Sequence, residues 1–261
     1  MTEREVDATP TLGPEGRRSR IADRVLGSGS ASAQELAEEF GVSVMTIHRD
    51  LDELQRQGVL RKSRGIATAQ PSGTFESNVG YRAKANIEAK RLIAQHACRH
   101  VEPGMSVLLD DSTTAMQMLP HLAALAPLTV ATNYLAALVE LAKVRDVHVV
   151  ALGGQYDVQH DSFLGSACVD AVLAMRFDAA FVSTSAVGDG YAFHQEDKIV
   201  AVKRAMVDVA ARSHLLIDHT KLTRSALHRF ASVVVDPGVP ARDLAALREN
   251  DVLVEVAGRT D

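Results

Sequence analysis

Between residues 33 and 64 the apolar positions recur with the period of two short amphipathic helices. We expect the first helix to begin after Ser32, because Ser32 and Glu35 form the signature of a capping box. We expect it to end at Gly41, since glycine readily adopts the left-handed backbone that closes a helix. The pattern therefore predicts a short helix that is followed at once by a second one.

The second predicted helix spans residues 44–57 and is capped by Ser43. Its inner face is formed by apolar residues at helical spacing, namely Val44, Ile47, Leu51 and Leu54. Gly58 ends the helix, and residues 59–62 have the composition of a strand. Two helices joined by so short a turn, with a strand after them, predict a winged helix-turn-helix, in which the second helix enters the major groove of DNA.

The outer face of the second helix carries polar and cationic side chains that suit contacts with phosphates and base edges. The residues that we assign to DNA binding are Ser43, Thr46, His48, Arg49, Lys62 and Arg64. The partner expected for this region is therefore a double-stranded DNA operator. The alternative interpretation is a helical hairpin that packs against something other than DNA.

Net charge alone does not identify a DNA-binding domain here. Residues 1–70 carry ten Lys and Arg against eleven Asp and Glu, and the whole chain has a formal net charge of −5. The domain must therefore gather its cations on one face. Candidates for that face, besides the cations of the wing, are Arg17, Arg18, Arg20 and Arg24. We expect affinity to fall with salt, because phosphate contacts release counterions.

In the remainder of the chain, short apolar runs alternate with helical stretches. The candidate strands are residues 106–110, 128–132, 147–152, 179–183, 214–218, 232–236 and 252–256. Several of them are almost continuously apolar, as strands buried on both faces must be. This alternation predicts an α/β domain with a mostly parallel, doubly wound sheet.

Polar residues follow most of these strands, at the edge of the sheet where such folds bind ligands. Hydroxyl groups and glycine backbone at strand-to-helix turns present donors to an anion. Lys221 offers a cation to a phosphate, Lys203 is a further candidate for that role, and Asp110 and Asp218 offer acceptors to sugar hydroxyls. The residues assigned to effector binding are Asp110, Asp111, Ser112, Thr113, Thr114, Thr132, Asn133, Gly153, Gly154, Lys203, Asp218 and Lys221. This set predicts a small phosphorylated sugar or polyol, and the alternative is that these are ordinary turn and cap residues.

The pattern divides the chain into four segments. We expect residues 1–15 to be disordered, residues 16–70 to form the winged helix-turn-helix, residues 71–82 to be a linker, and residues 83–261 to form the effector-sensing domain. A hydrophobic content of 46% is enough for a substantial core.

Composition also indicates in which cellular compartment the protein is expected. No apolar run reaches the roughly 18–20 residues that span a membrane, and the N-terminus lacks the apolar segment of a secretory signal. Cys98 and Cys168 have no metal-ligand spacing and are expected to be reduced thiols. The sequence therefore predicts a cytoplasmic protein with no membrane partner.

No cofactor is expected. The chain lacks the GxGxxG motif of dinucleotide sites. No tight metal-ligand spacing is found among the histidines His100, His121, His148, His160, His194, His214, His219 and His228. We therefore predict neither a metal site nor a nicotinamide or flavin site.

The second helix resembles that of the DeoR family of bacterial transcriptional regulators, whose pattern is Ser-x-x-Thr-Ile-Arg-Arg-Asp-Leu. The matching residues are Ser43, Thr46, Ile47, Arg49, Asp50 and Leu51. His48 stands where the family has its first Arg, and Ser63-Arg64-Gly65 replaces a His-Gly-Gly in the wing. Both departures suggest a changed operator preference or affinity.

The second domain resembles the family's sensor domain, whose fold is similar to ribose-5-phosphate isomerase and which binds phosphorylated sugars or related metabolites. The family's Asp-Ser-Gly-Thr-Thr loop corresponds to residues 110–114, with Asp111 and Ser112 as departures. The other matching residues are Thr132, Asn133, Gly153, Gly154, Lys203, Arg204, Met206, Asp218, Thr220 and Lys221. Asp111 would oppose a phosphate nearby, which leaves open an uncharged or differently placed ligand.

The resemblance implies a repressor of a carbohydrate or polyol catabolic operon that a small metabolite releases from DNA, acting as a homodimer or homotetramer. An activator is equally compatible with the sequence. The alternative from another class is a sugar-phosphate isomerase-like enzyme in which Asp110, Asp218 and Lys221 perform acid–base chemistry and the hairpin docks a partner. The intact pattern from Ser43 to Leu51 favours the regulator, because an enzyme has no need of it.

Overall fold

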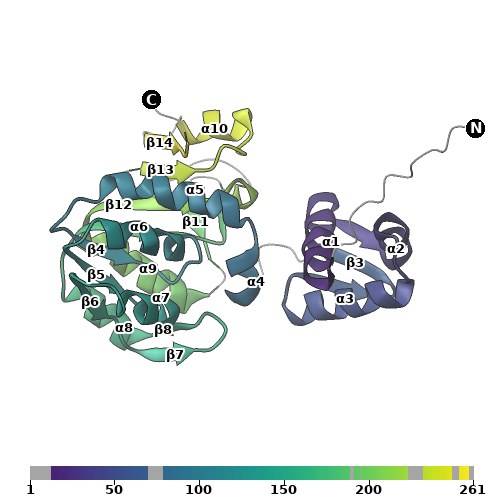
Figure 1. Ribbon diagram of the computed structural model, residues 1–261, viewed down its shortest axis with the longest axis horizontal. Coiled ribbons are helices and arrows are strands. Elements are labelled where there is room, and N and C mark those ends of the chain that lie inside the picture. Colours follow the sequence, from purple (N-terminus) through teal and green to yellow (C-terminus); the bar gives the residue numbers. More distant parts are fainter. Residues whose placement is uncertain are drawn as a thin grey trace, which may run out of the picture. The chain divides into compact units, whose positions relative to one another are not determined.

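The computed structural model describes residues 13–69, 79–188, 191–194, 196–222, 232–248 and 253–258. The chain divides into two compact units, Met1–Ser77 and Asn78–Asp261 (Figure 1). Each unit is described below by itself. Most of the segment predicted to be disordered, residues 1–12, lies outside the described residues, as do residues 71–78 of the predicted linker.

The N-terminal unit is a winged helix-turn-helix, as the sequence predicts. Its elements are α1 (Pro14–Ser28), β1 (Ser30–Ser32), α2 (Ala33–Phe40), α3 (Val44–Arg56), β2 (Leu60–Ser63) and β3 (Ile66–Ala69). The strands form an antiparallel sheet in the order β1-β3-β2. Both halves of the capping box at Ser32 and Glu35 are present, and Gly41 closes α2 with a φ of 63°. The core of the unit is built from fully buried aliphatic side chains, among them Ile21, Leu36, Ile47, Leu51 and Leu54.

The wing is a tight hairpin. β2 ends at Ser63 and β3 begins at Ile66, so only Arg64 and Gly65 form the turn. Both have positive φ values, 49° and 81°. A two-residue hairpin turn needs this left-handed backbone at both positions, which glycine adopts without strain and arginine does not.

The second unit is an α/β domain. Its elements are α4 (Val79–Lys84), α5 (Ile87–Ala97), η1 (Cys98–His100), β4 (Ser106–Leu109), η2 (Ala115–Met118), α6 (Leu119–Ala124), β5 (Leu128–Thr132), α7 (Leu135–Leu141), β6 (Val147–Ala151), β7 (Gln155–Asp157), β8 (Ser162–Leu164), α8 (Ser166–Leu173), β9 (Phe177–Val182), β10 (Ala186–Gly188), β11 (Tyr191–Phe193), α9 (Asp197–Val209), β12 (Ala210–Ile217), η3 (His219–Lys221), β13 (Ser232–Val235), α10 (Ala241–Arg248) and β14 (Leu253–Val256). Seven strands form one sheet in the order β14-β13-β12-β9-β4-β5-β6, and every neighbouring pair is parallel.

Helices cover both faces of this sheet (Figure 1). One face packs against α8, α9 and α10 through residues such as Val172, Met206 and Leu247. The other packs against α5, α6 and α7 through residues such as Ile93 and Leu122. The prediction of a doubly wound sheet is therefore confirmed, and the nearly continuous apolar runs of the strands follow from burial on both faces.

The strand order reverses between β4 and β9. From β4 the chain proceeds to β5 and β6 on one side, whereas β9, β12, β13 and β14 extend to the other side. In open α/β sheets the loops after the strands at such a switch point diverge and leave room for a ligand. The loops after β4 and β9 therefore define where a ligand is expected.

Three features differ from the sequence prediction. Residues 79–82 of the expected linker are helical, because they belong to α4. Two short hairpins, β7–β8 and β10–β11, were not predicted, since strands of three residues are too short for a recognisable alternation. Gly154 has a packing reason of its own, because a Cβ there would lie 2.6 Å from the carbonyl oxygen of Leu164.

Candidate functional site

Several of the side chains that the sequence assigns to DNA binding lie on α3 or at its start. Ser43 caps the helix by accepting a hydrogen bond of 3.1 Å from the backbone N–H of Thr46, and the two hydroxyl groups are 2.9 Å apart. Arg49 is exposed, and His48 is half-buried. Met45 was not predicted, yet its side chain is 62% exposed near the start of the helix. An exposed methionine at this position has no packing role, and it offers an apolar contact of the kind made to thymine methyl groups.

Lys62 already contacts other residues of the N-terminal unit. Its Nζ lies 2.5 Å from the carboxylate of Asp52 and 3.3 Å from the backbone oxygen of His48. Arg64, at the tip of the wing, is exposed. Arg49 and Arg64 form no ion pair with any other part of the chain that the structure describes. These two arginines are therefore better placed than Lys62 to meet phosphates or bases.

The arginines of α1, which the sequence offers for a cationic face, have partners within the N-terminal unit. Arg17 Nε lies 2.6 Å from the carboxylate of buried Asp50, and Arg18 is 3.6 Å from the same group. Arg24 pairs with Glu39 at 3.2 Å. Arg20 lies over the ring of Phe40, with 5.8 Å between the guanidinium carbon and the ring centroid. These contacts hold α1 against α2 and α3, and a role of the same arginines in DNA binding stays a prediction.

At the carboxyl edge of the large sheet, Lys203 bridges two buried carboxylates. Its Nζ lies 2.5 Å from Asp110 and 3.0 Å from Asp111. Asp110 also accepts hydrogen bonds from the backbone N–H groups of Ser112 and Ser183, at 3.0 and 2.7 Å. Asp110 thereby joins the loop after β4 to the loop after β9, across the switch point. Lys203, which the sequence offers as a phosphate ligand, is instead neutralised within the protein.

The charges in this bridge stabilise one another. Burial opposes the charged form of Lys203, but the two carboxylates raise the pKa of Lys203 above its ordinary value. Burial likewise opposes ionisation of Asp111, but Lys203 and the hydroxyl of Ser162 hold the pKa of Asp111 below its ordinary value. Lys203 and Asp111 are therefore both charged at neutral pH.

A second set of polar contacts, around Lys221 and Asp218, adjoins the bridge of Lys203. Lys221 Nζ donates to the hydroxyl of Ser183 at 3.0 Å. Asp218 accepts a hydrogen bond of 3.2 Å from the side chain of Asn86 and is also bonded to Thr220. Burial opposes ionisation of Asp218, whereas Lys221 and Thr220 hold the pKa of its carboxyl below the ordinary value. The loops after β4, β9 and β12 are thus connected through Ser183.

The remaining predicted residues belong to the next two loops. Thr132 accepts a hydrogen bond from the backbone N–H of Tyr134, and Asn133 donates to the carbonyl of Phe163 in β8. Asp111 reaches the same hairpin, because it accepts a hydrogen bond of 2.9 Å from Ser162. The structure thus connects the loops after β4 and β5 through β8. Gly153 and Gly154 lead from β6 into the β7–β8 hairpin.

Buried polar atoms without partners gather at this edge. Within the described ranges, four buried side-chain atoms have no hydrogen-bond partner, and three of them follow the carboxyl ends of β4, β5 and β9. The three are Thr114 Oγ1, Asn133 Oδ1 and Ser185 Oγ. An unpaired buried polar atom costs free energy, so such atoms usually have a partner in water or a ligand. Thr113, by contrast, donates to the carbonyl of Arg82.

Two residues of this region were missed in the sequence. Asn86 precedes α5 with a φ of 52° and reaches Asp218 and Thr220. Arg82 contacts His160 at 3.3 Å, and its positive charge acts on Asp111. Their separation in sequence from every loop of the sheet hid them, and Arg82 lies in a segment that resembled a linker.

A winged helix-turn-helix joined in one chain to a doubly wound domain with a polar switch point defines a DNA-binding transcriptional regulator with a sensor domain. Residues 17–72 match the sequence model of the DeoR-like helix-turn-helix domain, and residues 85–235 match that of the DeoR C-terminal sensor domain. The chain belongs to the DeoR family.

Relatives along most of the chain are transcriptional regulators. The chain is 30% identical to a candidate repressor of the aga operon from Escherichia coli O157:H7, over 94% of this chain and 95% of that protein. It is 27% identical to the glycerol-3-phosphate regulon repressor of Escherichia coli K12, over 92% and 98%. It is 29% identical to the L-fucose operon activator of Haemophilus influenzae, over 78% and 82%.

Among solved structures, ribose 5-phosphate isomerase A from Methanocaldococcus jannaschii aligns with 53% of this chain and 56% of that protein, at 17% identity and a TM-score of 0.40. Within the described residues, no helix is long and apolar enough to cross a membrane.

Proposed function

We propose that this regulator is a repressor of a carbohydrate or polyol catabolic operon and that a small phosphorylated sugar or polyol releases it from DNA. Several relatives are named for the genes that they regulate, and these names refer to glycerol 3-phosphate, L-fucose and lactose. The names support a sugar or polyol metabolite as the effector. One of these relatives is an activator and the others are repressors. We therefore propose repression, and transcription of the target operon in the presence and absence of the protein tests it.

DNA binding is assigned to α3 and the wing. Arg49 and Met45 are the side chains of α3 best exposed for base contacts, and Arg64 extends the surface with a cation at the wing tip. Ser43 and Thr46 are expected to contact phosphates at the start of the helix, and His48 and Lys62 complete the set. Because one helix-turn-helix reads a short half-site, we expect a homodimer or homotetramer on repeated half-sites.

Effector binding is assigned to the carboxyl edge of the large sheet. The single observation that carries this assignment is the gathering of buried, unpartnered oxygens of Thr114, Asn133 and Ser185 around the switch point. A ligand rich in hydroxyl groups would satisfy these acceptors and donors together. A phosphate group would find positive charge at Lys221 and Arg82.

The same edge has features that limit the ligand. Asp111 adds a carboxylate, but Lys203 offsets its charge. The phosphate is therefore expected on the side of Lys221, and the hydroxyl groups on the side of Asp111 and Asn133. Release from DNA then requires that the effector bind a DNA-binding conformation and a non-binding conformation of the protein with different affinities.

A catalytic role is the competing function. Asp218 and Lys221 are an acid and a base of the type that isomerases use, but Asp218 is held as a carboxylate and Lys221 donates to Ser183. The family assignment favours regulation without catalysis. Measurable turnover of ribose 5-phosphate by the purified protein would favour the enzyme.

The test of the proposed function is a DNA-binding titration. Full-length protein is added to labelled DNA from upstream of its own gene, and fluorescence anisotropy is measured with and without a panel of phosphorylated sugars and polyols and their unphosphorylated counterparts. We expect specific, salt-sensitive binding that one phosphorylated member weakens. Absence of specific binding at low salt contradicts the DNA role, and release by an unphosphorylated member alone contradicts the phosphate assignment.

A further inference from the structure

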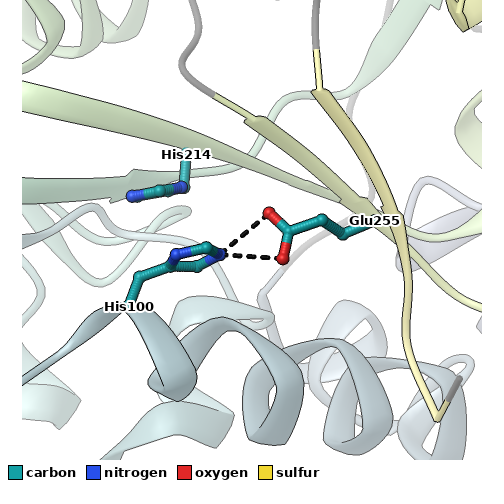
Figure 2. Close-up of side chains that lie close together, drawn as sticks. All are labelled: His100, His214 and Glu255. Atoms are coloured by element: carbon teal, nitrogen blue, oxygen red, sulfur yellow. Dashed lines mark hydrogen bonds and ion pairs between the residues drawn. The ribbon is translucent and has the colours of Figure 1, made fainter. Parts of the chain in front are cut away.

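A cluster of imidazoles and one carboxylate lies on the face of the sheet that α5 covers, and the proposed function does not use it. His100 comes from η1, His214 from β12 and Glu255 from β14 (Figure 2). One ligand atom from each of the three residues lies within 4.8 Å of the others. Residues that are far apart in the sequence are therefore brought together by the fold.

The carboxylate and one ring are already in contact. His100 Nε2 lies 2.8 and 2.9 Å from the two oxygens of Glu255, and Figure 2 shows the ring edge of His100 turned toward that carboxylate. The His214 ring stacks on that of His100, with 4.3 Å between centroids and an angle of 18° between planes. Two imidazoles and a carboxylate thus share one small volume.

A metal ion needs neutral imidazoles and an ionised carboxylate, and it displaces the proton of any imidazolium that it binds. A cluster of two imidazoles and one carboxylate offers ligand atoms of both kinds.

The cluster also has supporting contacts. His96 Nε2 lies 3.1 Å from Glu255, on the carboxylate oxygen Oε2. His214 Nδ1 lies 2.7 Å from the hydroxyl of Ser232, and its Nε2 is buried with no hydrogen-bond partner in the described part of the chain. Partners of this kind orient the ligands of protein metal sites.

We propose that His100, His214 and Glu255 bind a divalent transition metal ion of the Zn²⁺ type, with water at the fourth position. Two nitrogen ligands and one oxygen ligand suit Zn²⁺ better than Mg²⁺ or Ca²⁺, which take oxygen ligands. Ligand atoms around tetrahedral Zn²⁺ are roughly 3.3 Å apart, and imidazole nitrogens bind a metal ion in the plane of the ring. Because the rings of His100 and His214 are stacked, one of them must turn out of the stack when the ion binds.

The position of the cluster indicates what such an ion would do. β14 is the edge strand of the large sheet and pairs only with β13 within the described residues. An ion held by η1, β12 and β14 ties this edge to the body of the domain. The side chains of His100 and Glu255 are 20% and 13% exposed, which leaves a route for the ion from solvent.

The test uses the full-length protein, without an affinity tag, after removal of metals with a chelator. ZnCl₂ is titrated calorimetrically, and CoCl₂ is titrated with visible absorption as a report of tetrahedral coordination. We expect one ion per chain and a Zn²⁺-dependent rise in the melting temperature, because an ion that binds only the folded state stabilises it.

Variants locate the site. His100→Gln and Glu255→Gln are expected to abolish high-affinity binding, and His96→Gln to weaken it on the order of tenfold. His148→Gln removes an exposed histidine elsewhere and is expected to bind Zn²⁺ as the original chain does. Melting curves without metal check that each variant folds, and the CoCl₂ titration of the original chain stands even where a variant does not.

Two results would overturn the proposal. The first is no uptake of Zn²⁺ or Co²⁺ by the original chain. The second is uptake that His100→Gln and Glu255→Gln leave unchanged. In either case the cluster is a structural network of hydrogen bonds around Glu255. Neither result bears on the proposed DNA or effector role, whose residues lie elsewhere.

Discussion

The two functional regions of this regulator expose their key side chains in opposite ways. On the DNA-binding unit, Arg49 and Arg64 are exposed and make no ion pair with the described chain. At the switch point of the sensor unit, Asp110 and Asp111 are buried and Lys203 bridges them. The exposed cations of the first region are free to pair with a polyanion such as DNA. In the second region, Lys203 already pairs with the two carboxylates. Variants of the first should affect binding, and variants of the second should affect folding as well.

The largest effect is expected at Lys203. Lys203→Met leaves two buried carboxylates without their cation, which typically costs about 3–5 kcal/mol of unfolding free energy. Lys198→Met, an exposed position on the same helix, is the control and should cost little. Urea unfolding followed by circular dichroism measures both. Equal stability of the two variants would show that the bridge does not stabilise the domain.

A smaller, pH-dependent loss is expected at Asp111. The pKa of the Asp111 carboxyl is lower in the folded chain than its ordinary value of 3.8. The ionised carboxylate therefore contributes fully to the unfolding free energy above about pH 4, and this contribution is lost as the pH falls further. Asp111→Asn should lower the unfolding free energy by about 1–3 kcal/mol at pH 6 and by less at pH 3. The exposed Asp208→Asn is the control. A difference that persists undiminished at pH 3 contradicts the ionic explanation.

At the DNA-binding surface, Arg49→Ala should weaken specific binding by about 1–3 kcal/mol without destabilising the protein. Arg56→Ala is the matched control, because Arg56 lies on the same helix but pairs with Glu53 at 2.6 Å. Anisotropy titrations at several salt concentrations measure both affinity and its salt dependence. Equal losses for the two variants would mean that charge alone, and not the position of Arg49, governs recognition.

The smallest effect is expected at Arg64, whose two properties oppose each other. Its φ of 49° is strained for arginine, so Arg64→Gly should raise stability by up to about 1 kcal/mol. The same change removes a cation and should reduce the salt slope of DNA binding by about one. Arg64→Ala also removes the charge but does not relieve the left-handed backbone, so it separates backbone from electrostatic effects. An unchanged salt slope in both variants would remove Arg64 from the DNA surface.

The sequence predicts the small unit more completely than the large one. Ser32, Gly41 and Ser43 mark helix ends through contacts within four residues, so local patterns suffice. The strands of the large sheet are also recognisable, because burial on both faces leaves long apolar runs. The pairing of Arg17 with Asp50 was not visible, since it joins two helices that are 33 positions apart.

The residues of the sensor site were easier to identify than their roles. Polar strand ends are local signals, and they directed attention to Asp110 and Lys221, which the structure places at the carboxyl edge of the sheet. The bridge from Lys203 to Asp110 spans 93 positions and depends on how α9 packs against the sheet. The same reason hid the cluster of His100, His214 and Glu255, because metal-ligand spacing in sequence is informative only where the ligands are close in the chain.

In the proposed function, a ligand at the switch point controls DNA binding. The most direct measurement compares the original chain with Lys221→Ala, and with exposed Lys198→Ala as control, in the anisotropy assay with the effector that the panel identifies. We predict that all three proteins bind DNA equally and that only Lys221→Ala fails to be released at effector concentrations that release the other two. Release of Lys221→Ala at the same effector concentration would contradict it.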